Sequence, residues 1–294
     1  MGIVAASSSL SSQPLSVDVL LATLAAACLH ATWNAIAHWI PDKTVSFTLV
    51  NLGSMLCGVP LICLAAPPDP RSWIWLGASA VLHLAYNGLL MASYRLGDLS
   101  QTYPLARGTS PLVVTLVAAI FLGELPTASQ IAGVLLISGG LALLVFWGYR
   151  THPASPTAIR TAVATGVMIA AYTTCDGIGV RAAGSTIGYI GWLMVLGEFG
   201  VPILAVAQRG RGLWKQLRPY LLLGLSGGLF SVLGYGLILW AQTRGGLADI
   251  AALRESSIIV GALIGALLFK EGFGRARIVA TCAVAAGIAV MYLR

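Results

Sequence analysis

Charge is scarce in this sequence. Only 9% of its 294 residues are Asp, Glu, Lys or Arg, whereas an ordinary soluble domain carries roughly 25%. Hydrophobic residues make up 57% of the chain. A chain with so few charges lacks the polar surface of a soluble protein, so we predict an integral membrane protein.

The motifs of common enzyme chemistry are also missing. The sequence has no HExxH, no paired Gly-Asp motif within an apolar run and no nucleotide-binding loop. Its five cysteines lie in apolar runs without a Cys-x-x-Cys spacing or histidine partners, so they are expected to pack rather than form disulfides or bind metal. We therefore predict neither an enzyme, nor a cofactor, nor a metal site. The expected protein is a carrier that runs on gradients rather than ATP.

The beginning of the chain carries no address signal that we can identify. Residues 1–16 lack the basic segment and apolar core of a secretory signal, and we expect a disordered lead. The net charge of +7 lies in short loops and indicates topology rather than a phosphate-binding face. Nucleic acid is thus not an expected partner, whereas membrane lipid and a small-molecule substrate are.

Long apolar runs fill the rest of the chain, and each is long enough to cross a hydrocarbon core of ~30 Å as a helix. Dividing them at charges, prolines and glycines gives ten expected spans, at 18–39, 45–66, 73–94, 99–122, 128–148, 158–180, 186–207, 219–242, 247–269 and 275–293. The predicted fold class is an all-α integral membrane protein with ten transmembrane helices.

The second half of the sequence repeats the first. The stretch 98–124 aligns with 245–271, half a chain length later, so that Arg107 falls on Arg254. HATWNAI in the first span also aligns with YTTCDGI in the sixth, which places Asn34 opposite Asp176. We divide the chain into two five-helix repeats, 17–150 and 151–294. An odd number of spans in each half predicts inverted repeats, an arrangement that recurs in secondary transporters with substrate sites near the midplane.

The distribution of Lys and Arg predicts the orientation. Eleven lie in or near the loops after odd-numbered spans, and four lie on the opposite side. The positive-inside rule then places both termini outside.

Four ionisable residues lie deep within apolar runs, where charge is costly and marks a functional site by default: Arg107, Glu198, Arg254 and Glu255. One interpretation is that they neutralise one another, for example Arg107 with Glu198, in ion pairs that only hold helices together. The other is a cavity that offers a cation to a carboxylate and an anion to an ammonium, which suits a zwitterion.

Aromatic and amide side chains accompany these charges in the expected spans. The candidates for the substrate site are Trp33, Asn34, His83, Tyr86, Asn87, Tyr103 and Tyr235. His83, Tyr86 and Asn87 share one helix face. For the tyrosines two roles stay open, lining the cavity or packing in the core. His30 or His83 is a candidate for carrying a coupled proton, with a hydrogen-bonded packing role as the alternative.

Two prolines flank Arg107 in the fourth span. Pro104 and Pro111 each remove a backbone donor and are expected to loosen that helix, so we assign them to gating and predict a more rigid ninth span. Glu124 and Glu271 end the fourth and ninth spans, and we expect each to cap the N-terminus of the next helix or to form an ion pair across the repeats.

YPLARGTSP, the following LGE, and LRESSIIVGALIGALLFKE resemble the EamA-type branch of the drug/metabolite transporter superfamily. The resemblance covers the chain from about residue 18 onward. It implies a single chain with a central cavity between the halves, open to one side at a time. We expect the protein to be monomeric. It also implies export of amino acids or other small metabolites. Ten-span members are expected to have both termini inside, so the side of the termini stays open.

We therefore predict an inner-membrane secondary transporter that exports amino acids, aromatic ones among them, or related zwitterions. Arg107 and Arg254 would bind the carboxylate, and Glu198 or Glu255 the ammonium or a proton. The alternatives are a multidrug exporter of lipophilic cations and a membrane scaffold or sensor that transports nothing.

Overall fold

Every secondary-structure element that the structure describes is helical. The computed structural model describes residues 15–96, 99–151, 155–268 and 275–292. The expected disordered lead and Glu271 fall almost wholly outside these residues.

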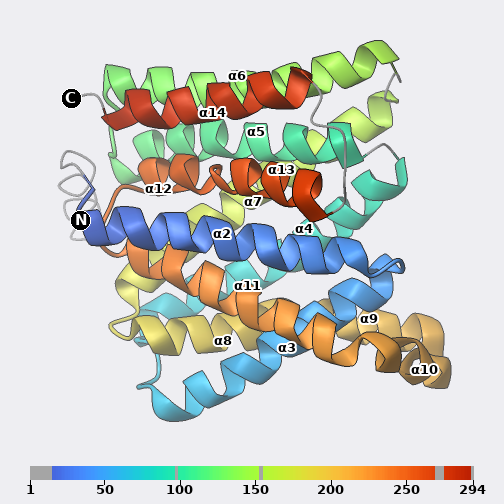
Figure 1. The fold of residues 1–294 in the computed structure, drawn as a ribbon. Helices are drawn as coiled ribbons and strands as arrows, with labels where there is room; N and C mark the ends of the chain where they lie inside the picture. The colour runs from blue at the N-terminus through green and yellow to red at the C-terminus, as the bar shows by residue number, and fades with distance from the viewer. Residues whose placement is uncertain (1–14, 97–98, 152–154, 269–274, 293–294) are drawn as a thin grey trace.

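The first half of the chain forms long helices joined by short turns (Figure 1). They are α2 (Val17–Trp39), α3 (Lys43–Leu64), η1 (Pro70–Ser72), α4 (Trp73–Leu96), α5 (Leu99–Val117), the π-helical segment η2 (Ala118–Leu122) and α6 (Ala128–Thr151). Local signals set their starts: the Asp42 side chain accepts the backbone N–H groups of Thr44 and Val45 and so caps α3.

The second half is more interrupted. Its elements are α7 (Pro156–Ala182), α8 (Thr186–Glu198), α9 (Gly200–Arg209), η3 (Gly210–Gly212), α10 (Leu213–Leu217), η4 (Arg218–Tyr220), α11 (Leu221–Gln242), α12 (Leu247–Arg254), α13 (Ser257–Leu268) and α14 (Arg275–Tyr292). Ser155 and Ser185 cap α7 and α8, and Pro156 occupies the first position of α7, where no N–H is needed.

The helices agree with most predicted span boundaries to within a few residues, but two predicted spans are broken. The seventh divides at Phe199 into α8 and α9, and the ninth divides at Glu255–Ser256 into α12 and α13. Seven stretches of the described residues are helical, apolar and long enough to cross a membrane, and one of these, Thr186–Gln242, contains α8 to α11. The count of ten spans stays a prediction.

The packing of the helices is symmetric between the two halves. The counterpart of α2 in the second half is α7, and that of α4 is α11; α2 packs on α11, and α7 packs on α4. In the same way α3 packs on α11 and its counterpart α8 packs on α4. The contact of α13 with α2 likewise corresponds to that of α5 with α7. The equivalent helices α6 and α14 pack on each other, as do α3 and α8. Helices of one half thus have most of their partners in the other half, and the space between the halves becomes the centre of the protein.

Two ends of the bundle are distinguished below. α2 begins and α14 ends at the terminal end (Figure 1). The α2–α3 turn and the segment from α9 to α10 lie at the opposite end, which we call the basic end after Arg209, Arg211 and Lys215.

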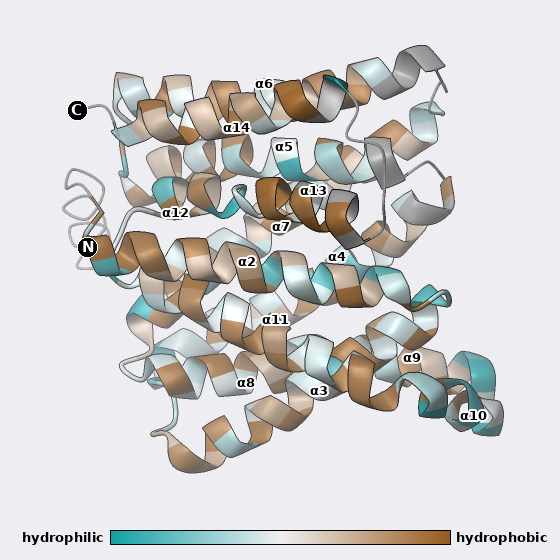
Figure 2. Cartoon of the chain, in the orientation of Figure 1, coloured by the Kyte–Doolittle hydropathy of each residue, from teal (hydrophilic) through white to brown (hydrophobic). Residues whose placement is uncertain are grey.

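The outer surface is apolar along the helices. Leu64, Leu222 and Leu267 expose 85%, 84% and 77% of their surface. Figure 2 shows hydrophobic residues along the outer helices and hydrophilic colour gathered near α10. A continuous apolar surface of this kind suits contact with lipid and would promote aggregation in water.

Glycines allow α3 and α11 to pack closely. A Cβ on Gly53 would lie 2.6 Å from the backbone oxygen of Leu225, and one on Gly228 would meet the backbone of Val50 and Ser54. Backbone atoms cannot move aside as a flexible side chain can. Small residues at such contacts are how membrane helices approach each other.

We expect Gly228→Ala to lower the free energy of unfolding by ~1–3 kcal/mol, the usual cost of overpacking. Gly88→Ala in α4 is the matched control, because a Cβ there meets no atom within 4 Å. The control should leave stability unchanged or raise it by up to ~1 kcal/mol through helix propensity. Thermal unfolding in detergent measures both variants, and equal effects would contradict the close-packing account.

Candidate functional site

A cavity of about 70 Å³ lies between the two halves of the chain. Its polar and aromatic lining consists of His30, Trp33, Phe47, Asn51, His83, Tyr86, Asn87, Tyr172, Glu198, Ser231, Tyr235 and Arg254. These residues come from α2, α3, α4, α7, α8, α11 and α12. The first half of α3 and the last residue of α8 contribute, so the cavity extends from the middle of the bundle toward the basic end.

The structure brings most of the predicted site residues together. Trp33, His83, Tyr86, Asn87, Glu198, Tyr235 and Arg254 line the cavity. Asn34, Tyr103, Arg107 and Glu255 are outside its lining. The Asn34 amide instead donates to the backbone carbonyl of His30 at 2.7 Å, and the Arg107 guanidinium lies 5.7 Å from the Tyr103 ring centroid.

Arg254 is the cation of the cavity. It is the last residue of α12, is 5% exposed, and makes no ion pair with any residue that the structure describes. Its Nε has no hydrogen-bond partner among the described residues, although the guanidinium lies close to the Tyr172 hydroxyl. A buried guanidinium without a carboxylate presents unused donors and an uncompensated positive charge to the cavity.

Glu198 is the anion of the cavity, and a proline places it. Pro202 lacks the N–H that would bond to the Glu198 carbonyl one turn earlier, and α8 ends there. The Asn51 amide of the other repeat donates to that freed carbonyl at 3.2 Å. The half-buried Glu198 carboxylate makes no ion pair or side-chain hydrogen bond within the described part of the chain.

Arg107 pairs with Glu255 rather than Glu198. Arg107 NH1 lies 3.4 Å from Glu255 Oε1, and NH2 donates to the Ser257 hydroxyl at 2.8 Å. Both charged side chains are at least 97% buried. The suggested Arg107–Glu198 pair is therefore wrong in its partner, because the break between α12 and α13 places Glu255 beside α5. Arg107 holds this break in position from the opposite repeat.

The expected interruption lies in the other repeat. α5 continues through Pro104 and Pro111 and ends only at the π-helical segment η2. The loosening of the fourth span at its prolines is therefore not seen, and the helix break occurs at Glu255–Ser256 in the ninth. The cause is a run of four polar residues, 254–257, whose serines favour turns and caps over helix interiors. The gating role of the prolines stays a prediction.

Aromatic rings form the wall between the charges. Tyr172 lies at the centre, with its ring centroid 4.2 Å from His83, 5.3 Å from Tyr86 and 6.2 Å from Tyr235. Tyr172 was missed among the candidates, although the repeat alignment places it opposite His30, which lines the same cavity.

A buried polar cluster lies at the terminal end. Arg181 NH1 pairs with Glu124 Oε1 at 2.7 Å, and its other nitrogens donate to the carbonyls of Gln242 and Gly245. Glu124 Oε2 accepts the N–H of Leu247, the first residue of α12. The expectation that Glu124 pairs across the repeats is confirmed. The helix that it caps is α12 in the other repeat, not the next helix along the chain, α6.

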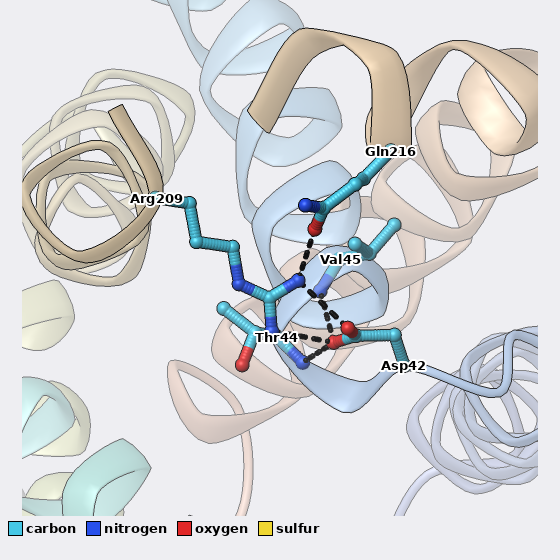
Figure 3. A network of polar contacts seen from close by, with 5 residues as sticks. All are labelled: Asp42, Thr44, Val45, Arg209 and Gln216. Atoms are coloured by element: carbon cyan, nitrogen blue, oxygen red, sulfur yellow. Dashed lines mark hydrogen bonds and ion pairs between the residues drawn. The ribbon is translucent and has the colours of Figure 1, made fainter. Parts of the chain in front are cut away.

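A second network joins the repeats at the basic end (Figure 3). Arg209 binds Asp42 through two contacts of 2.7 and 3.0 Å and also donates to Gln216. The guanidinium holds the pKa of the Asp42 carboxyl below its ordinary value. This pair is much more exposed than Arg181–Glu124, so water competes for it and the basic end is held together more weakly.

Comparison with known proteins identifies this architecture. The EamA-like transporter family matches residues 18–146 and again residues 156–293. The chain belongs to the EamA-like transporter family. The resemblance seen in the sequence motifs is thus confirmed, and the EamA unit occurs twice. Because the family consists of membrane transporters of small molecules, this EamA chain is a multi-pass membrane transporter with a small-molecule substrate.

Structural comparison agrees on the fold. A solved structure described as "Crystal structure of protein" superposes with a TM-score of 0.70 over 94% of this chain and 97% of its own, at 16% identity. That likeness shows the shared fold alone. No curated protein matches this EamA chain by sequence.

Proposed function

We propose that this transporter exports amino acids or related small zwitterionic metabolites from the cell across the inner membrane. It would work as a secondary transporter by alternating access, with ten spans in two inverted repeats. The symmetric packing of the two halves supports the repeat arrangement, because it pairs equivalent helices around one centre.

The observation that carries the substrate class is the pair of unpartnered charges in one cavity. Arg254 presents a guanidinium and Glu198 a carboxylate, and neither forms an ion pair with any described residue. A substrate that carries both a carboxylate and an ammonium satisfies both groups and removes the cost of leaving them uncompensated. Arg107 and Glu255 already balance each other's charge, so the substrate contacts fall to Arg254 and Glu198.

The size and lining of the cavity support a small substrate with an apolar or aromatic side chain. Cavities that enclose drug-sized ligands measure ~300–1,000 Å³, against about 70 Å³ here. The rings of Trp33, Tyr86, Tyr172 and Tyr235 offer stacking surfaces beside the charges.

The proposed cycle uses the two ends of the bundle. The cavity extends toward the basic end, which the Lys and Arg distribution assigns to the cytoplasm. The buried Arg181–Glu124 cluster would block the terminal end. Substrate would enter from the basic end, and release would require that cluster to open.

We expect Glu198→Gln to reduce counterflow of a labelled amino acid in proteoliposomes by ~10-fold or more, since a hydrogen bond to a charged group is worth ~1.5–3 kcal/mol. The same variant should transport the deaminated analogue of that amino acid, which keeps the carboxylate, about as well as the wild type does. Asp69→Asn, on the loop before η1, is the control for loss of a carboxylate.

The two rival functions predict different results in this assay. An exporter of lipophilic cations would exchange cationic drugs but no amino acid, and would depend on Glu198 rather than Arg254. A scaffold or sensor would exchange nothing. Either pattern in the wild-type protein would overturn the zwitterion proposal.

A further inference from the structure

Asp176 is a fully buried carboxylate beside the cavity, and the proposed substrate contacts do not use it. It lies on α7, and its side chain is 0% exposed. Its Oδ1 accepts the Tyr189 hydroxyl at 3.1 Å, and its Oδ2 accepts the Tyr235 hydroxyl at 2.6 Å. Gly179, one turn later, leaves the space that the Tyr189 ring occupies, so this hydrogen bonding is built into the helix packing.

Within the described residues, no cation pairs with this carboxylate. Two other buried carboxylates, Glu124 and Glu255, each have an arginine within 4 Å, whereas Asp176 forms no ion pair with any residue that the structure describes. Hydroxyl donors alone do not cancel a charge. In the membrane interior an uncompensated carboxylate is costly, and binding a proton removes that cost.

The groups that face Asp176 come from several helices. They are Ser79 and His83 on α4, Tyr189 on α8, Tyr235 on α11, and Tyr172 and Cys175 on α7 itself. Arg107 on α5 and Arg254 on α12 lie toward Tyr172 instead. Only the His83 ring can become a cation among the facing groups, and it makes no ion pair with Asp176.

A hydrogen-bonded route joins the carboxyl group to the cavity. Tyr235 lines the cavity and donates to Asp176, and the His83 ring lies edge-on to Tyr235 with centroids 6.0 Å apart. A hydronium ion in the cavity can pass a proton to the Tyr235 oxygen while that hydroxyl passes its own proton to Asp176 Oδ2. Water and an intact tyrosine remain, and one proton has moved onto the carboxylate.

We propose that Asp176 takes up and releases the proton that is coupled to substrate movement. This inference rests on the proposed transport function and adds the coupling ion to it. Tyr235 connects the two events because it contacts both the cavity and the carboxylate. A substrate that displaces the Tyr235 hydroxyl removes a hydrogen bond from Asp176 and so changes the affinity of Asp176 for the proton.

The test compares two transport modes of the full chain in proteoliposomes. Wild-type protein should exchange labelled for unlabelled amino acid at equal pH and should also accumulate it against a concentration gradient when a pH difference is imposed. A difference of one pH unit can support a ratio of about tenfold for one coupled proton. Asp176→Asn should retain exchange within about twofold and show an accumulation ratio near one.

Asp249→Asn is the matched control, since Asp249 is a buried carboxylate on α12 that bonds to Gln130 outside the cavity lining. It should keep pH-driven accumulation. If Asp176→Asn accumulates substrate as the wild type does, or if a sodium gradient drives the wild type and a pH gradient does not, the proposal fails.

A substrate-free measurement separates this inference from the substrate assignment. Infrared difference spectra between acid and alkaline pH should show a protonated-carboxyl band in the wild type that is lost in Asp176→Asn and kept in Asp249→Asn. If no amino acid is exchanged but this band behaves as expected, the proposed substrate is wrong and the proton site stands. If the band does not change in Asp176→Asn, the proton site is wrong.

Discussion

Arg254→Met is expected to reduce amino-acid counterflow in proteoliposomes by ~100-fold or more. Arg254 is the cavity's unpaired cation, and a bound carboxylate can accept two N–H donors from one guanidinium. Two hydrogen bonds to charged groups are worth together ~3–6 kcal/mol, and each 1.4 kcal/mol is tenfold. Methionine removes the charge but retains an unbranched side chain, so the packing at the end of α12 changes little.

Arg254→Lys tests whether geometry matters in addition to charge. Lysine keeps the positive charge but lacks the planar pair of donors, so it binds a carboxylate as a point charge. We expect intermediate counterflow, about tenfold below the wild type. If Arg254→Lys instead loses as much counterflow as Arg254→Met does, and at every pH tested, the paired donors of the guanidinium are essential.

Arg244→Met is the matched control for the loss of an arginine. Arg244 follows α11 and is largely exposed. Its NH1 lies 3.4 Å from Asp18 Oδ2, and neither residue lines the cavity. Counterflow in this variant should equal that of the wild type. Unchanged counterflow in Arg254→Met would contradict the proposed carboxylate site.

The positions of the helices were predictable because apolar run length and charge placement determine them. The predicted seventh and ninth spans show the limit of that approach. Apolarity continues across Pro202, so the sequence pattern predicted one helix where the missing donor produces two. In the ninth span, the serines at 256 and 257 were a weaker signal of a helix break, and the prediction of one continuous helix did not take them into account.

The partners of the buried charges were not predictable, because hydropathy says nothing about which side of a helix faces which neighbour. The sequence placed both Arg107 and Glu198 deep within apolar runs, but the helix break turns Glu255 toward Arg107 and leaves Glu198 in the cavity. Repeat symmetry held more information than we used. It aligned His30 with Tyr172, and both line the cavity.

The last prediction separates a structural role of Arg107 from a substrate role. Arg107→Met leaves the Glu255 carboxylate buried at 1% exposure without its cation. Breaking a buried ion pair from one side typically costs ~3–5 kcal/mol. We expect a corresponding loss of thermal stability in detergent, with a loss of similar size for Glu255→Met.

The double variant Arg107→Met/Glu255→Met should recover most of that stability, because apolar side chains can replace a buried pair at little cost. Arg107→Met alone combines lost stability with lost transport and cannot distinguish the two roles. A double variant that is stable and still exchanges amino acid would identify the pair as a support for the break that positions Arg254. A stable double variant without exchange would instead assign Arg107 to the substrate, as the symmetry of the two arginines in the sequence first suggested.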